Sequence, residues 1–208
     1  MGPLLFSAGG KGDGAAARNV IGPLVGAMAW LTLILASWLR FDFRGDLDQL
    51  EYLKTLPVSS SALAAGQIVT PTVLMTLCHA LVVAGVCAAT RRVSPEMVLV
   101  LALALPFNAL LFGIENWIFL LFPSRAAANP GDVQGYGRQV LILLAKGGLV
   151  LVAASIAGGA AGGVYALSGS MLAAGATAVV LMCALAAATV PLVALAFRRF
   201  DVAAGVPG

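Results

Sequence analysis

Charged side chains are scarce in this 208-residue chain, where Asp, Glu, Lys and Arg make up 10% against about a quarter in a soluble domain. With 61% hydrophobic residues, the chain could not cover its surface with polar groups in water. Histidine occurs once, at His79, and the three cysteines lie in apolar stretches, which argues against a histidine-rich metal site and a disulfide framework. The Gly-x-x-x-x-Gly-Lys-Ser/Thr run of nucleotide-binding loops is missing too, so neither a bound nucleotide nor a cofactor is expected.

Long apolar runs take the place of those features. A membrane-spanning helix needs about 20 mostly apolar residues. Five segments qualify, at about 20–39, 66–89, 97–122, 140–167 and 171–197. They predict an all-α polytopic membrane helix bundle over 20–208, after an N-terminal tail at 1–19.

Basic residues at the ends of these runs predict an orientation. One side of the membrane would hold four Lys and Arg residues and the other eight, if Lys146 extends its side chain to the second side. The excess favours a cytoplasmic C-terminus and an external N-terminus. Because the basic residues flank apolar runs, they mark topology and do not form a nucleic-acid surface.

The longest loop between predicted spans, residues 40–65, is then cytoplasmic. Four leucines at every third position from Leu47 to Leu56 predict one stripe of a short helix, with Asp46, Asp48 and Glu51 in its first turns. Pro57 ends that helix, and one of the serines at 59–61 caps the next one. The loop is either a solvated amphipathic connector or a docking element for a cytoplasmic partner.

Among the polar residues within the predicted spans, His79, Asn108 and Glu115 are the candidate functional ones. A carboxylate in the membrane costs at least about 2.5 kcal/mol, so Glu115 should face the bundle interior with Asn108, two turns earlier. They form a polar patch lining a path or linking helices, or the third segment ends early and Glu115 lies near the interface. His79 is interpreted as a packed residue with one hydrogen-bond partner, with a substrate-path role as the alternative.

The loop at 48–67, a short acidic helix followed by Thr-Leu-Pro-Val-Ser and a helix entering the membrane, resembles the coupling region of type 2 ABC transporter permeases. It is most similar to the bacterial putative ABC exporter group. The passages at 112–116, 129–132, 137–139 and 199–202 fit the same group. The resemblance covers most of the chain from about residue 39 onward.

The resemblance implies an exporter permease in the bacterial plasma membrane, with an ATP-binding-cassette ATPase and a second permease subunit as partners. It implies six spans with the coupling helix between the second and third, so one N-terminal span is expected to be missing here. The partner-coupling residues would be Asp46, Asp48, Leu50, Glu51, Leu53, Lys54, Leu56 and Pro57. The alternative is a non-transporting membrane assembly or regulatory protein. An intramembrane hydrolase is disfavoured, because Ser168 and Ser170 lie in a different segment from the only histidine.

Overall fold

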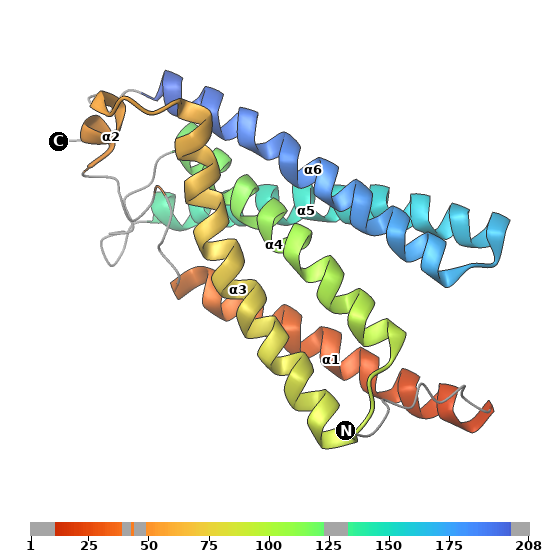
Figure 1. The fold of residues 1–208 in the computed structure, drawn as a ribbon. Coiled ribbons are helices and arrows are strands. Elements are labelled where there is room, and N and C mark those ends of the chain that lie inside the picture. Colours follow the sequence, from red (N-terminus) through yellow and green to blue (C-terminus); the bar gives the residue numbers. More distant parts are fainter. Residues whose placement is uncertain (1–10, 39–42, 44–48, 123–132, 201–208) are drawn as a thin grey trace.

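The computed structural model describes residues 11–38, 43, 49–122 and 133–200, and all regular elements in these ranges are helices (Figure 1). In chain order they are α1 (Lys11–Trp38), α2 (Leu50–Thr55), α3 (Ser60–Thr90), α4 (Pro95–Leu121), α5 (Val133–Ser168) and α6 (Met171–Arg199). The predicted all-α helical bundle is therefore confirmed.

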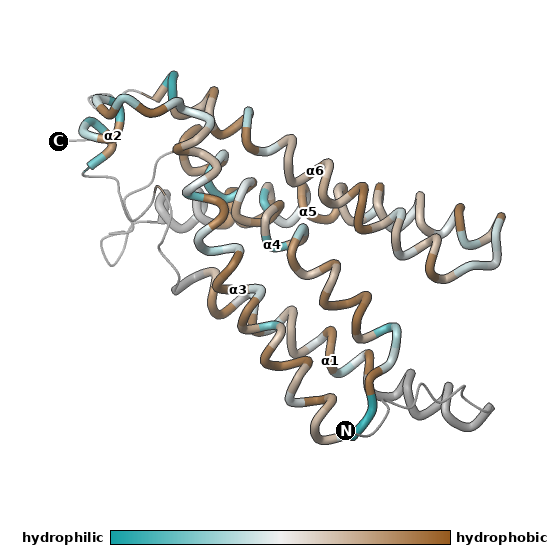
Figure 2. The backbone as a smooth tube through the Cα atoms, in the orientation of Figure 1, coloured by the Kyte–Doolittle hydropathy of each residue, from teal (hydrophilic) through white to brown (hydrophobic). Residues whose placement is uncertain are grey.

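Four of these helices, α3 to α6, are long and apolar enough to cross a membrane. At about 1.5 Å per residue, candidate spans of 27 to 31 residues exceed the length needed for a hydrocarbon core of about 30 Å. The chain is thus a multi-pass membrane protein. The first predicted span, 20–39, lies in α1, whose apolar part Ile21–Ala36 is shorter than the other four. Helix α1 also begins at Lys11, inside the predicted tail. Apolar residues follow each long helix along most of its length (Figure 2).

The ends of the helices follow from local chemistry. Leu56 is extended (φ −68°, ψ 141°), as expected before a proline, so α2 ends at Thr55. The Ser59 hydroxyl accepts a hydrogen bond from the backbone N–H of Ala62 and caps α3, as predicted. Helix α2 begins at Leu50. The two aspartates predicted for its first turns, Asp46 and Asp48, lie outside the described residues.

Short turns make the long helices alternate in direction. Arg91 to Ser94 join α3 to α4, and Gly169 with Ser170 joins α5 to α6. Gly169 has φ 65°, a left-handed conformation that glycine adopts without strain. Helix α2 lies at the end of the bundle where α4 and α6 finish, here named the α2 end, and both turns lie at the opposite end (Figure 1).

Helices α4 and α6 run in the same direction and pack closely. A Cβ atom added to Gly113 would lie 2.6 Å from the Cβ of Thr189, and one added to Gly175 would lie 2.6 Å from Leu99 Cδ1. The two contacts are separated by 14 residues on both helices. A repeat of seven continues between and beyond them, because positions 106, 113 and 120 of α4 and 175, 182, 189 and 196 of α6 are all buried. A seven-residue repeat keeps one face of each helix toward the other.

Candidate functional site

A neutral polar network inside the bundle joins α1, α3 and α4. The His79 ring of α3 is 2% exposed. Its Nε2 lies 3.0 Å from the Thr32 hydroxyl and 3.2 Å from the Met28 carbonyl oxygen, both in α1. Its Nδ1 lies 3.3 Å from Asn108 Nδ2 in α4. The single partner predicted for His79 is therefore an underestimate, because helices on two sides contact the ring.

These partners fix the proton on the neutral ring. A carbonyl oxygen only accepts hydrogen bonds, so Nε2 carries the proton that points to Met28. Nδ1 is then an acceptor and receives a hydrogen bond from the Asn108 amide, which also donates to the Thr76 hydroxyl at 3.1 Å. Asn108 Oδ1 is buried and has no hydrogen-bond partner within the described part of the chain. The network therefore attaches α1 to the α3–α4 hairpin.

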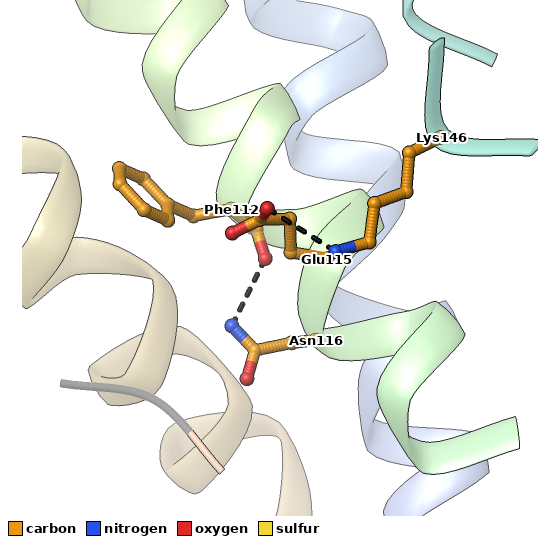
Figure 3. A network of polar contacts seen from close by, with 4 residues as sticks. All are labelled: Phe112, Glu115, Asn116 and Lys146. Carbon is orange, nitrogen blue, oxygen red and sulfur yellow. Dashed lines mark hydrogen bonds and ion pairs between the residues drawn. The ribbon is translucent and has the colours of Figure 1, made fainter. Parts of the chain in front are cut away.

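A charged pair links α4 to α5 near the α2 end. Lys146 Nζ lies 3.3 Å from Glu115 Oε1, and the side chains are 19% and 9% exposed (Figure 3). Helix α4 continues to Leu121, one residue short of the predicted end at 122, so Glu115 lies within the helix, six residues before its last residue. The prediction that Lys146 extends its side chain toward the second side of the membrane did not anticipate this pairing with a carboxylate of α4.

The expected joint patch of Asn108 and Glu115 does not form. Asn108 takes its partners from α3, and Glu115 pairs with a lysine of α5. Helix α4 is contacted by α3, α5 and α6, so two residues on one stripe of it can face different neighbours. Among the contacts that the structure describes, Asn108 and Glu115 thus belong to different networks.

Asn116, next to Glu115, belongs to a third arrangement at the α2 end. Its Nδ2 donates to the Phe112 carbonyl at 2.9 Å, within α4 (Figure 3). Its Oδ1 accepts a hydrogen bond of 3.2 Å from the backbone N–H of Phe43. The Phe43 ring, fully buried, stacks on Phe197 of α6 with centroids 5.0 Å apart. Phe43, which lies seven residues before the start of α2, is therefore attached to both α4 and α6.

The short helix α2 has two different faces. Leu50 is fully buried, and Leu53 packs against the same apolar cluster, which includes residues from the ends of α4 and α6. Glu51 and Tyr52 are exposed, as are Pro57 and Val58 after the helix. The inner face is anchored on this chain, and the outer face is open.

This arrangement revises the predicted partner-coupling set. Leu50 cannot fill a groove on a partner, because its side chain is buried inside this chain. Lys54 donates a hydrogen bond to the Phe200 carbonyl and lies over the rings of Phe197 and Phe200, at 5.9 and 6.0 Å from their centroids. Of the rest of the set, Glu51 and Pro57 are exposed, Leu53 and Leu56 are partly exposed, and Asp46 and Asp48 lie outside the described residues.

Sequence reasoning missed several participants. Thr32 and Thr76 gave no signal, because threonines are frequent in apolar helices and bond their own backbone. Phe43 and Phe200 appeared only as hydrophobic residues beside charged ones. A partial signal did exist for Lys146, since an intramembrane lysine and an intramembrane carboxylate are both costly unless they pair.

No cluster of three or more metal-ligating side chains occurs among the residues that the structure describes. The cysteines Cys78, Cys87 and Cys183 are free thiols. Comparison with protein-family models, curated proteins and solved structures finds no match for this chain. Its function must therefore be argued from its own residues. Helix α2, with one buried face and one exposed face, is the most informative feature for that argument.

Proposed function

We propose that this chain is the membrane-spanning permease subunit of an ATP-binding-cassette exporter. It would pair with a second permease subunit, identical or related, and with a separate ATPase that hydrolyses ATP. Four apolar helices of spanning length, and a sequence without a nucleotide-binding loop, are compatible with that division of labour. The substrate would cross between helices of the bundle without chemical change.

The observation that carries the proposal is the difference between the two faces of α2. A helix that transmits a push must offer one face to the partner and be attached to the spans by the other. Tyr52 is 65% exposed and Val58 is 47% exposed, whereas Leu50 is fully buried in an apolar cluster with residues of α3, α4 and α6. Aromatic residues such as Tyr are enriched at protein interfaces, which supports a partner-binding role for this exposed face.

On this proposal, the α2 end faces the cytoplasm and the membrane is the bacterial plasma membrane. The C-terminus is then cytoplasmic as well, because α6 finishes at the same end as α2 (Figure 1). A single cysteine at the exposed position Gln49, in a chain without its native cysteines, tests the orientation. Labelling by a membrane-impermeant thiol reagent in intact cells would place α2 outside and contradict the proposal.

Co-purification with an ATPase subunit encoded beside this gene tests the partner. We expect the pair to form a complex with stimulated ATP hydrolysis, and Tyr52→Ala to reduce binding about tenfold, as for an interface aromatic residue worth above 1 kcal/mol. Tyr165→Ala is the matched control, because Tyr165 is 53% exposed but lies in α5 near the opposite end. Failure of the wild-type chain to bind or stimulate the ATPase would favour a membrane assembly or regulatory protein.

A further inference from the structure

Lys54 makes an unusual contact for a residue in a short surface helix. Its ammonium group donates to the backbone carbonyl of Phe200, 146 residues later, just after the last turn of α6. Carbonyls at a helix C-terminus lack partners within the helix, and the negative end of the helix dipole attracts a cation there. The rings of Phe197 and Phe200 lie within 6.0 Å of the same ammonium group and favour a cation over their faces.

We infer that Lys54 is a positioning residue that ties α2 to the C-terminal end of α6 and so directs a displacement of α2 into α6. The inference rests on the proposed function for the source of that displacement. The Lys54 side chain is itself exposed, so the inference concerns the contact that its ammonium group makes with the end of α6, and not burial of the residue.

The connection of α2 to α3 is of a different kind. Between the two helices the chain is extended at Leu56 and at Ser59, and the Val58 N–H bonds the Leu56 carbonyl at 2.7 Å in a tight turn. Such a turn can change its dihedral angles without breaking a helix, so it acts as a hinge. Besides the Lys54 contacts, two more residues near α2 pack on α6. Leu50 lies in an apolar cluster that includes α6 residues, and the Phe43 ring stacks on Phe197. The apolar cluster that holds Leu50 also includes Ala64 and Ile68 of α3, so the Lys54 contacts are what ties α2 to α6 in particular.

Helix α6 in turn carries α4 with it. The Thr189 side chain of α6 packs on Gly113 of α4, and the Leu99 side chain of α4 packs on Gly175 of α6, so the two helices are in close contact at both points. Phe43, which precedes α2, also bonds the Asn116 side chain of α4. A displacement of α2 would thus move α4 and α6 together.

Hydrogen exchange of the full-length protein in lipid nanodiscs tests the tie without any partner. Lys54→Met keeps the apolar stem but removes the cation and the donor, and we expect the amides of α2 to exchange about fivefold faster. Lys54→Arg restores a cationic donor and should stay within twofold of the wild type. Arg198→Met is the matched control, because it removes an exposed cation at the same end of α6 and should leave α2 unchanged.

Unchanged exchange of α2 in Lys54→Met, in protein that elutes and melts like the wild type, would overturn the inference. So would faster exchange in Lys54→Arg equal to that in Lys54→Met, because a cation would then not be what holds α2. Should Lys54→Met fail to fold, Lys54→Gln keeps a donor without the charge, and exchange at the wild-type rate in it would also overturn a tie made by the cation.

A second measurement separates this inference from the proposed function. In the complex with the ATPase, Lys54→Met should bind the ATPase with unchanged affinity but lose at least half of the coupled transport. Weaker ATPase binding with normal exchange would place Lys54 in the partner surface and overturn the tie. Absence of ATPase binding by the wild-type chain would overturn the proposed function and the coupling role, while the exchange result still decides whether Lys54 holds α2.

Discussion

Helices α5 and α6 both pack against α4, but by different means. Helix α6 meets α4 through glycine positions where the neighbouring side chain fills the space of the missing Cβ. Helix α5 is held by the Glu115–Lys146 pair and by small residues such as Ala153 and Ala157, while its own glycines at 158, 159, 162 and 163 have no atom within 4 Å of an added Cβ. Gly113 and Gly175 therefore contribute to helix packing, because a side chain of the opposite helix occupies the space beside each of them. The four glycines of α5 make no such contact within this chain.

The largest expected effect comes from filling the closest contact of α4 with α6. Gly113→Ala would place a methyl group against the Thr189 side chain, so we expect the free energy of unfolding to fall by about 3 kcal/mol, the upper part of the range for overpacking. Unfolding in mixed SDS micelles measures it. Thr189→Gly in the same chain removes the obstructing atoms and should recover most of the loss. If stability is not recovered, the Thr189 side chain is not what prevents a larger residue at position 113.

The second largest effect is expected from breaking the ion pair that links α5 to α4. Lys146→Met takes the ammonium group from a carboxylate that is 9% exposed, and we expect a loss of about 2 kcal/mol in the same measurement. Glu115→Gln should cost less, because the longer lysine side chain can extend toward the membrane surface. The double variant should be more stable than Lys146→Met alone. Additive losses would show that the two side chains do not interact.

A smaller effect is expected where a neutral network links α3 and α4. Asn108→Leu removes the hydrogen bonds to Thr76 and His79, and with them an oxygen that has no partner among the described residues. The expected loss is about 1 kcal/mol, since hydrogen bonds between membrane helices contribute modestly. Thr70→Val is the control, because the Thr70 hydroxyl bonds only the Gly66 carbonyl of its own helix among the contacts described. Equal losses in both variants would remove the case for a network between helices.

The smallest effect should come from the open glycines of α5. Gly158→Ala meets no neighbouring atom, so the change in unfolding free energy should stay within about 0.5 kcal/mol, with a small gain from helix propensity. A large loss would show that another chain covers this face in the membrane. Size-exclusion chromatography with light scattering on the same samples distinguishes that case from a local defect.

The parts of the fold that could be predicted from sequence are those set by neighbours along the chain. Hydropathy located four of the five predicted spans, α3 to α6, while the first lies in α1, whose apolar part is shorter. Pro57 ended α2, and Ser59 capped α3 as expected. Each of these depends on residues within a few positions of one another, where propensity and capping chemistry act directly.

The contacts that could not be predicted join residues distant in sequence. Lys146 lies 31 residues from Glu115, and the Thr32–His79 pair is separated by 47. Gly113 and Gly158 are the same residue type in similar apolar surroundings, and only the helix opposite distinguishes them. Leu50 and Leu53 follow one stripe, as predicted, but the pattern could not say whether this chain or a partner covers it.

The attachment of α2 to Phe200 sets an order for biosynthesis. During translation α2 emerges 146 residues before the carbonyl that Lys54 binds, a delay of about 7–30 s at 5–20 residues per second. Throughout that interval the leucines of α2 lack the rings of α6 that later cover them. Helix α2 can therefore reach its final packing only after the last helix has been made.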